Sequence, residues 1–463
     1  MKTHLRLSMV VAILILLSLM GVDLSQAQQI PSQGFHNEIY GHANLPWSSQ
    51  YVQRQFDPPL DVGGYVSIAL LPLNDFLAIS YYDATNQSLM VATPIASHLG
   101  NCGTRNNWVC VTLDSSGDVG KFSSIDLWGY SLDNWKMGIS YYDSTARSLK
   151  AAIYTCFEGS CAWEKITVSA PDSPDFSEGL YSSFKFNSTG NASIAFFHYN
   201  SVHLDSILEY AYQVPSGGDC GEGPAAGLWE CDEVNLLGGE GIYASLDFSY
   251  DDVAYIAYYS ADQGDLLLAI QGGMCGPELG WSCLFLDGAD ANVGLFASLI
   301  APQSSIGPFR VAYHDRTNGH LKIIDSDWGE PVVVDEMGTS LEPMGISMVI
   351  DDEGYPVIAY QQIASDFSPP TLRISRPYMA YGTDPYGNCG DSPPGYLFQY
   401  WQCKTLDYGG QYSEEADFAA MAINSKGLVG IAYSEYDTDY YVGSLKFTYQ
   451  HLFRTLMPIT NRH

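Results

Sequence analysis

The sequence AISYYDATNQSLMVA (residues 78–92) returns 60 positions later as GISYYDSTARSLKAA (residues 138–152). Each copy reads as an apolar strand, a tight turn and a second apolar strand. Five more divergent copies of the first strand follow: FFHYN (196–200), IAYYS (256–260), VAYHD (311–315), IAYQQ (358–362) and IAYSE (431–435). The chain is therefore built from seven copies of one unit.

A second landmark lies about 17 residues before these strands and sets the length of the unit. It is a turn followed by an aromatic and a small residue, as in DVGGYVSIAL from Asp61 and DVGKFSSIDL from Asp118. The successive spacings are 57, 59, 62, 53, 49 and 73 residues, and the units begin at Gly63, Gly120, Gly179, Gly241, Gly294, Pro343 and Ala416. A unit of this size holds four strands with their loops, as in one propeller blade.

The predicted fold class is all-β: a seven-bladed β-propeller of four-stranded antiparallel blades. The central strands are apolar throughout rather than alternating, as expected for blades that are covered on both faces. The last unit, from Ala416, ends after three strands, and residues 47–61 carry the pattern of the missing one. We therefore expect an N-terminal outer strand to close the ring, which leaves no unpaired edge.

The repeat with ISYYD, an SLKAA-type strand and a W-x-C segment resembles secreted bacterial propellers of the sialidase-like (BNR-like) superfamily. The resemblance covers about residues 47–449. It implies the propeller architecture, and it implies no single activity because this group mixes hydrolases, lyases and lectins.

The two ends of the chain lie outside the repeats. Lys2, Arg6, an apolar run and Ser25-Gln26-Ala27 are typical of a signal peptide, so we expect cleavage after Ala27. We assign residues 1–27 to this peptide, 28–46 to an N-terminal segment, 47–449 to the propeller and 450–463 to a C-terminal tail. No later segment is apolar over about 18 residues, so no membrane span is predicted. We expect a secreted or extracytoplasmic protein.

The chain is strongly acidic, with 20 Lys and Arg against 52 Asp and Glu and a formal net charge of −32. Such a charge repels nucleic acid and anionic membrane surfaces, so it argues against nucleic acid as a partner. We expect a monomer, and the sequence contains no cofactor motif and no clustered Cys/His metal site.

The ten cysteines fall into neighbouring pairs, each between the third and the fourth strand of a unit. In an exported chain this spacing predicts disulfides rather than zinc ligands. The expected pairs are Cys102–Cys110, Cys156–Cys161, Cys220–Cys231, Cys275–Cys283 and Cys389–Cys403.

One face of the predicted ring collects the turns after each second strand and the connections between blades. Tyrosine and carboxylate side chains at these turns suit a sugar, because an aromatic face stacks on it and oxygens accept its hydroxyl protons. The candidate ligand-binding residues are Tyr82, Asp83, Tyr142, Asp143, Tyr199, Tyr259, His314 and Asp315.

A structural alternative stands beside this interpretation: the repeated Asp residues can simply form Asx turns. Two departures from the repeat are therefore the most informative. His314 stands where other units have tyrosine, and residues 366–396 form an insertion present only in the sixth unit.

The sequence contains few signatures of a catalytic site. A serine recurs at one position of the first strand (Ser67, Ser124, Ser183, Ser245, Ser298 and Ser347), where we expect a small side chain near the axis for steric reasons. No GxSxG elbow surrounds any of these serines, and no catalytic residue is assigned.

Two function classes stay open. The favoured one is a secreted, non-catalytic binding propeller for a glycan or a protein at or outside the cell surface. The alternative is a carbohydrate-active hydrolase or polysaccharide lyase whose site lies on the axial face.

Overall fold

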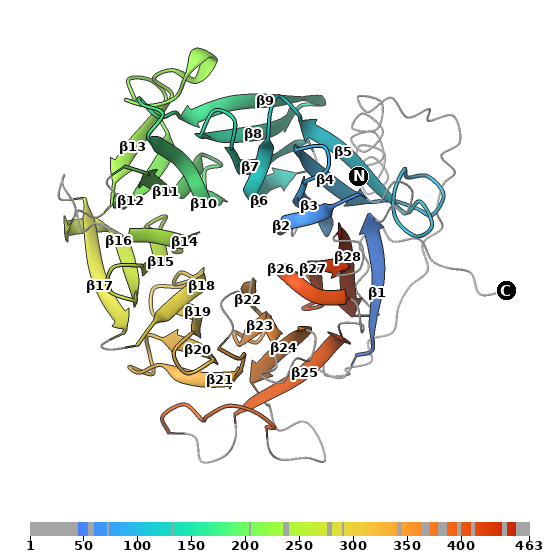
Figure 1. Cartoon of the computed structure of the whole chain (residues 1–463), viewed down its shortest axis with the longest axis vertical. Helices are drawn as coiled ribbons and strands as arrows, with labels where there is room; N and C mark the ends of the chain where they lie inside the picture. The colour runs from blue at the N-terminus through green and yellow to red at the C-terminus, as the bar shows by residue number, and fades with distance from the viewer. Residues whose placement is uncertain are drawn as a thin grey trace.

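Each repeat of the sequence folds into one four-stranded antiparallel sheet, and seven such sheets surround a central axis (Figure 1). The computed structural model describes residues 45–53, 60–71, 74–131, 133–202, 205–234, 240–275, 280–288, 291–339, 345–362, 370–377, 387–395, 400–408, 413–437 and 442–450. The segments assigned to a signal peptide (1–27) and to a tail (450–463) lie outside these residues, apart from residue 450, and so does nearly all of 28–46. The predicted seven-bladed propeller is confirmed.

The strands follow one another through each blade in sequence order. Blades one to three contain β2 (Val62–Leu71), β3 (Phe76–Asp83), β4 (Ser88–Pro94), β5 (Trp108–Asp114); β6 (Val119–Ser131), β7 (Asn134–Asp143), β8 (Ser148–Phe157), β9 (Ser160–Ser169); and β10 (Phe176–Phe186), β11 (Ala192–Asn200), β12 (Asp205–Gln213), the short 3-10 helix η2 (Gly223–Ala225) and β13 (Trp229–Glu233).

The remaining blades repeat this order. They contain β14 (Glu240–Phe248), β15 (Ala254–Ser260), β16 (Asp265–Cys275), β17 (Trp281–Asp287); β18 (Val293–Ile300), β19 (Arg310–Asp315), β20 (His320–Asp325), β21 (Val332–Glu336); β22 (Ile346–Ile350), β23 (Pro356–Gln362), β24 (Thr371–Pro377), β25 (Trp401–Tyr408); and β26 (Ser413–Ile423), β27 (Val429–Asp437), β28 (Val442–Gln450) with β1 (Trp47–Gln53). The first strand of each blade lies nearest the axis, and the fourth lies at the rim (Figure 1).

The ring is closed by its N-terminal strand, as predicted. Strand β1 pairs antiparallel with β28, so that Trp47 lies opposite Gln450 and Ser49 opposite Thr448. The Ser49 hydroxyl donates to Oγ1 of Thr448 over 3.0 Å. The seventh blade therefore takes three strands from one end of the described chain and one from the other.

The core lies between neighbouring blades. The second strands are buried almost end to end; in β3, seven of the eight residues are buried. Residues of blade one, such as Tyr81 and Trp108, share a cluster with Phe447 of blade seven. The outer tryptophans that marked the fourth strands (Trp108, Trp229, Trp281 and Trp401) are at most 2% exposed. Apolar contact between sheets, rather than within one sheet, accounts for the nearly continuous apolar strands.

A charged triad also joins neighbouring blades. Asp114, on the last strand of blade one, accepts hydrogen bonds from the Tyr141 hydroxyl and the Lys150 ammonium of blade two, both over 2.8 Å. The same arrangement recurs three times, as Asp287 with Tyr313 and Lys322, Asp335 with Tyr360 and Arg373, and Asp407 with Tyr433 and Lys446. In these four places the buried and half-buried groups fix the second and third strands of a blade against the preceding blade.

The recurring serines of the first strands form a further link between blades. Each hydroxyl oxygen accepts a hydrogen bond from a backbone N–H on the first strand of the next blade, over 2.9–3.1 Å. The pairs are Ser67 with Ile125, Ser124 with Phe184, Ser183 with Leu246, Ser245 with Leu299, Ser298 with Met348 and Ser347 with Met421. The steric explanation of these serines is therefore incomplete, because their hydroxyls hold adjacent inner strands together.

The seventh interface lacks this bond, because Ala420 occupies the serine position beside Ile68. We expect Ala420→Ser to supply the missing acceptor for the Ile68 N–H and to stabilise the closed ring by about 1 kcal/mol. In a chain of this size that gain raises Tm by only about 1 °C, so urea unfolding is the better measurement. Ala419→Ser, one residue away, is the matched control and is expected to give no gain. Equal unfolding midpoints for Ala420→Ser and the parent contradict this explanation.

All five predicted disulfides are present, and the described residues contain no free cysteine. Each ends on the fourth strand of its blade, with Cα–Cα distances of 4.1–6.0 Å. Cys156 and Cys275 lie at the end of the third strand, and the first cysteine of each other pair lies in the segment that follows it. Disulfides in this number are typical of proteins that fold in an oxidising compartment.

Candidate functional site

The predicted aspartates lie at the turns between second and third strands, where their carboxylates are occupied. Asp83 accepts from the backbone N–H and the side-chain amide of Asn86, and Asp315 accepts the same two bonds from Asn318. Asp143 accepts from two backbone N–H groups of its own turn. All three residues are buried. These bonds are the Asx turns that the sequence offered as the alternative to ligand contact.

The predicted aromatic candidates lie one layer back from the axis. Tyr82, Tyr142 and Tyr259 are at most 8% exposed, and the Tyr82 hydroxyl donates to Asp118 over 2.6 Å. His314 is fully buried with Nε2 3.1 Å from the carbonyl oxygen of Gly338, and burial lowers its pKa, which keeps the ring neutral. Contact of these residues with a ligand stays a prediction.

Blade three departs from the register that the sequence suggested. Phe197 pairs with Leu208 as Tyr82 pairs with Leu89, so Phe197 rather than Tyr199 occupies the position of Tyr82. The hairpin extends two residue pairs further in this blade, which displaces Tyr199 toward the turn. There its ring stacks on that of Phe197 with centroids 6.0 Å apart.

Within the insertion predicted at residues 366–396, residues 366–369, 378–386 and 396 lie outside the described residues. Its bounds were too wide, because strand β24 (Thr371–Pro377) of the regular blade lies within them. No role for the remainder follows from the structure.

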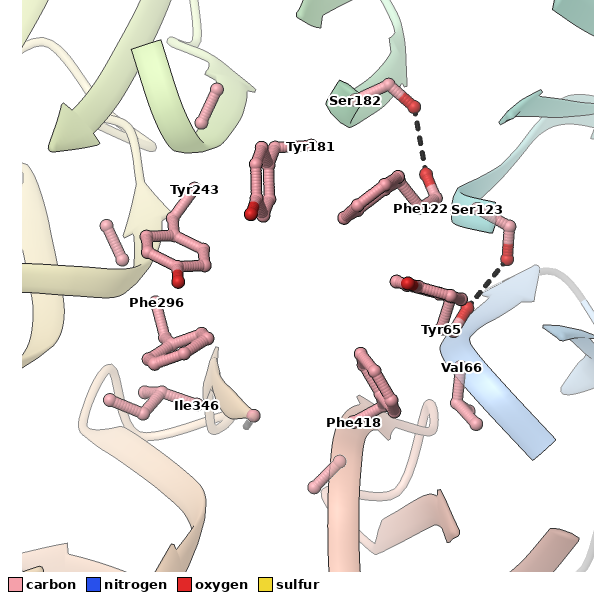
Figure 2. A pocket seen from close by; sticks show the side chains of 14 residues that line it. Tyr65, Val66, Phe122, Ser123, Tyr181, Ser182, Tyr243, Phe296, Ile346 and Phe418 are labelled. Atoms are coloured by element: carbon pink, nitrogen blue, oxygen red, sulfur yellow. Dashed lines mark hydrogen bonds between the residues drawn. The ribbon is translucent and has the colours of Figure 1, made fainter. Parts of the chain in front are cut away.

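A circle of six aromatic side chains surrounds the axis, nearer to it than the candidate residues described above (Figure 2). In six of the seven blades, the residue two positions before the inner serine, or before Ala420, points its ring toward the axis (Figure 2). We call this set the axial aromatic ring: Tyr65, Phe122, Tyr181, Tyr243, Phe296 and Phe418. Neighbouring rings lie 4.1–4.8 Å apart between centroids, with one gap where blade six has Gly345.

The backbone of the ring residues is strained in the same way in every blade that carries one. All six aromatics have φ between 51° and 57°, a left-handed conformation that costs a residue with a side chain about 1 kcal/mol or more. The register between first and second strands shifts at this point, for example between Gly64 and Ser67, which marks a bulge. Strain repeated six times around one axis is the kind of feature that clusters at functional sites.

A glycine two residues earlier makes room for this bulge in five blades. Gly63, Gly120, Gly179, Gly241 and Gly294 have φ of 97–112°. A Cβ atom on any of them would lie 2.7–3.1 Å from the backbone of a leucine on the third strand of the preceding blade. In these five blades, the glycine near the start of the first strand therefore allows the bulge that directs the following aromatic side chain toward the axis.

The axial aromatic ring encloses a cavity of about 420 Å³. Each blade contributes one aromatic, or Gly345, and the residue that follows it, so the lining combines aromatic and aliphatic side chains with tyrosine and serine residues. The hydroxyls of Ser123 and Ser182 donate to the carbonyl oxygens of Tyr65 and Phe122 and so hold the ring backbone (Figure 2). Burial raises the pKa of Tyr65 to about 12 and also raises that of Tyr181, so both remain neutral hydroxyls near pH 7.

Charged side chains occupy the same inner strands further along. Asp126, Lys185 and Asp247 stand two residues beyond the serines of blades two to four, and the Lys185 ammonium lies 3.8 Å from Asp247. Burial raises the pKa of both aspartates against the opposing charge of Lys185. None of the three lines the cavity.

The sequence contains the signal for this site within the landmark that sets the length of the repeat. The aromatic in YVS, FSS, YSS, YAS, FAS and FAA is the ring residue of its blade. Its direction could not be read from the repeat, because it depends on a left-handed backbone that an aromatic residue rarely adopts.

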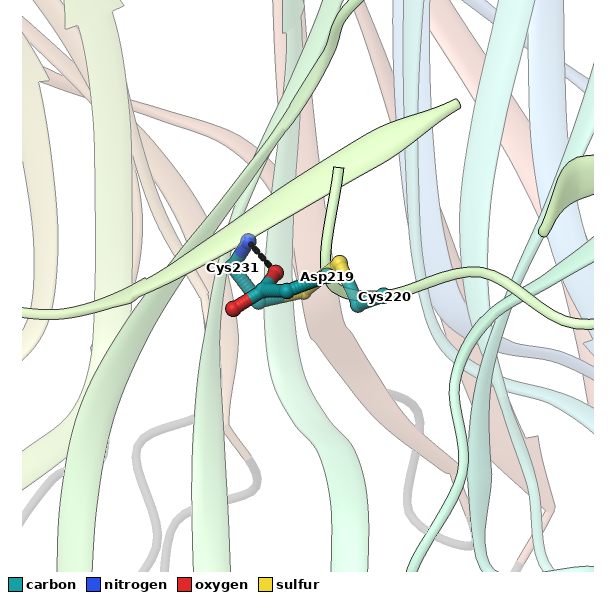
Figure 3. A group of neighbouring side chains, drawn as sticks. All are labelled: Asp219, Cys220 and Cys231. Atoms are coloured by element: carbon teal, nitrogen blue, oxygen red, sulfur yellow. Dashed lines mark hydrogen bonds between the residues drawn. A yellow bond between two sulfur atoms is a disulfide. The ribbon is translucent and has the colours of Figure 1, made fainter. Parts of the chain in front are cut away.

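Three groups of side chains in the described part of the chain have donors close enough to hold a metal ion. Two of them, Asp219–Cys220–Cys231 and Asp335–Cys389–Cys403, contain disulfide sulfurs, which are not thiolate ligands. Asp219 also accepts the backbone N–H of Cys231 (Figure 3). The third is Glu178–His198–Glu209. Burial opposes protonation of His198, but hydrogen bonds with both glutamates raise its pKa to about 10.

No protein-family model and no curated protein matches this sequence. Solved structures resemble the chain at low identity. A protein of unknown function from Dyadobacter fermentans is 8% identical, with 87% of this chain and 97% of that chain covered and a TM-score of 0.45. The polysaccharide lyase Uly1 is 10% identical, with 84% and 90% covered and a TM-score of 0.46.

A third structure is the α-L-arabinanase of Penicillium chrysogenum in complex with arabinobiose. It is 10% identical, with 71% of this chain and 98% of that chain covered and a TM-score of 0.43. At such identities, what these proteins bind or cleave does not transfer to this chain. Within the described residues, no helix has the length and hydropathy of a membrane span.

Proposed function

We propose that this protein is an extracytoplasmic, non-catalytic propeller that binds a glycan in the axial aromatic ring. The observation that carries the proposal is the repeated left-handed backbone that turns six aromatic side chains toward one cavity. Blade packing alone does not require an aromatic side chain at this position, since Gly345 fills it in blade six with a φ of 118°.

The chemistry of the cavity suits a sugar. Aromatic faces stack on the apolar C–H faces of a pyranose or furanose, and tyrosine hydroxyls can bond its hydroxyl groups. The volume of about 420 Å³ falls within the usual range of small-molecule sites. A protein partner needs an interface with a buried surface area of roughly 1,000 Å² or more, and a cavity of small-molecule size does not provide so large a surface.

The lining favours binding over hydrolysis. Glycoside hydrolysis needs a pair of carboxyl groups beside the scissile bond, and the described residues that line the cavity include no Asp, Glu or His. The lyase alternative would need an ionised tyrosine as the base, and the raised pKa values of Tyr65 and Tyr181 keep both hydroxyls protonated near pH 7.

The proposal includes the sequence-based expectations for the rest of the chain. Export follows cleavage after Ala27, the mature protein is a monomer of the sialidase-like propeller type, and no cofactor takes part. The net charge of −32 supports a partner other than nucleic acid or an anionic membrane.

The test starts from a glycan array probed with the chain from residue 28 onward, followed by calorimetry with the best oligosaccharide. We expect Tyr181→Ala and Tyr243→Ala each to weaken binding about fivefold to tenfold, since a stacked aromatic contributes on the order of 1 kcal/mol. Alanine keeps the Cβ atom, so the cost of the left-handed backbone is unchanged. Tyr408→Ala, on a residue 71% exposed at the rim, is the matched control and should bind like the parent.

Two results would contradict the proposal. One is that no glycan on the array binds the protein. The other is that the ring variants and the Tyr408→Ala control bind the oligosaccharide with equal affinity. Release of reducing ends or of unsaturated sugars from the bound oligosaccharide would replace it with the hydrolase or lyase alternative.

A further inference from the structure

Blade three reverses a charge pattern that other blades share. In blades two, five, six and seven, the third strand carries a cation (Lys150, Lys322, Arg373 or Lys446) that contacts an aspartate of the preceding blade. In blade three this position of the third strand is occupied by Glu209. The strand register shows the equivalence: Glu209 pairs with Phe196 on the second strand, just as Lys150 pairs with Tyr141 in blade two. His198 likewise stands where blade two has Asp143.

The reversal brings an imidazole and two carboxylates together on three adjacent strands. Nδ1 of His198, on β11, lies 2.8 Å from Oε1 of Glu178 on β10 and 3.1 Å from Oε1 of Glu209 on β12. One donor atom from each residue lies within 4.8 Å of the others. A metal ion would displace the proton held between His198 and the glutamates, and the cluster would then offer one nitrogen and two oxygens around a single point.

Glu178 provides a second and independent observation. The residue is only 4% exposed, and its Oε2 atom is buried with no hydrogen-bond donor among the described residues. A buried carboxylate oxygen without a donor is costly, and a cation bound beside it removes that cost. One oxygen of the Glu178 carboxylate therefore remains available as a ligand.

The local charge also favours a cation. Glu233 lies opposite Glu209 on the neighbouring strand β13, which adds a third carboxylate. Within the described part of the chain, no Lys or Arg lies within ion-pair distance of Glu178 or Glu209, and His198 is their only cationic neighbour. In the sister blades a lysine or arginine balances the same region.

We propose that Glu178, His198 and Glu209 form a binding site for a divalent transition metal of the zinc type. Imidazole nitrogen with carboxylate oxygens is a donor set that suits zinc, whereas calcium and magnesium prefer oxygen donors alone. Tetrahedral zinc with bonds of about 2.0–2.2 Å separates its donors by about 3.4 Å. The observed separations of 2.8 and 3.1 Å would therefore have to widen by about 0.6 and 0.3 Å.

Such an ion would join the first three strands of blade three just behind the axial aromatic ring. His198 follows Phe197, whose ring lies 5.9 Å from that of Tyr181. Three protein donors leave one position of a tetrahedral ion open to water or another ligand. The site lies outside the lining of the cavity, so its existence is independent of glycan binding.

The test uses the chain from residue 28 onward, free of any affinity tag and treated with a chelator, titrated with Zn²⁺ by calorimetry. We expect one Zn²⁺ per chain with micromolar or tighter affinity, a rise of Tm with Zn²⁺, and no comparable effect of Ca²⁺. Glu178→Gln and His198→Gln are expected to weaken Zn²⁺ binding roughly tenfold or more, since each removes a ligand. His320→Gln, a histidine outside the cluster, should leave it unchanged.

Circular dichroism of each metal-free variant shows whether it is folded. Should His198→Gln fail to fold, Glu209→Gln removes a different ligand and gives the same comparison. The proposal is overturned by absence of stoichiometric Zn²⁺ binding, by an equally strong Ca²⁺ effect, or by folded cluster variants that bind Zn²⁺ as the parent does.

Discussion

A chain that lacks residues 28–61 is expected to lose the cooperative unfolding transition of the intact propeller. The deletion removes β1, which supplies the outer strand of blade seven and pairs with β28 along its length. It also removes Val52, which is fully buried in the cluster that contains Trp108 and Phe447. The ring would then open at one blade and expose a strand edge, which promotes aggregation.

Calorimetry or urea unfolding followed by circular dichroism measures this effect. A chain that starts at residue 45 keeps β1 and is the matched control, with an expected transition like that of the chain from residue 28. Cooperative melting of the truncated chain at the temperature of the control contradicts strand closure.

A covalent link between the same two strands is expected to have the opposite effect. A Ser49→Cys/Thr448→Cys pair joins two residues that face each other and closes a loop of about 400 residues. This disulfide is expected to stabilise the ring by up to about 5 kcal/mol.

Asp114→Ala is expected to destabilise the protein by about 3 kcal/mol, because it removes the acceptor of the buried Tyr141 hydroxyl and leaves the Lys150 ammonium only the Ser116 hydroxyl at 3.0 Å and Asp143 at 3.7 Å. The side chain of Asp114 is 2% exposed and that of Lys150 is 14% exposed, so little water replaces the lost bonds. Urea unfolding near pH 7 measures the loss. Asp262→Ala, on an exposed turn, is the control and is expected to change stability by less than about 0.5 kcal/mol.

The same residue gives a pH dependence with a defined sign. Burial alone would raise the pKa of Asp114, but the hydrogen bonds from Lys150 and Tyr141 and the charges of Lys150 and Lys165 lower it to about 2. Its contribution to stability is present above the unfolded-state pKa of about 3.9 and is lost as the pH falls toward 2. The parent should therefore lose stability more steeply than Asp114→Asn over this interval. Parallel pH profiles for the two proteins would show that the triad does not hold Asp114 ionised.

The sequence by itself determined the number of blades, their strand order and the disulfides. These features are local: the turns of the first two units, DATNQS and DSTARS, each fold within a few residues, and each cysteine pair closes a short loop. Ring closure followed from counting, since the seventh unit had three strands and residues near Trp47 carried a fourth. The repeat also singled out Tyr82, Tyr142 and Tyr259, each of which contacts a member of the axial aromatic ring.

Only the tertiary structure decided which side chains meet. Phe296 and Phe418 are far apart in sequence yet line one cavity, because the left-handed bulges of the blades converge on one axis. Two additional residue pairs in one hairpin displace Tyr199 and place His198 beside Glu178 and Glu209. The inner serines look like small side chains in the sequence, and the distance between blades makes them acceptors for the next inner strand. Such contacts depend on register and on the angle between sheets, which are set by packing over the whole ring rather than by any single repeat.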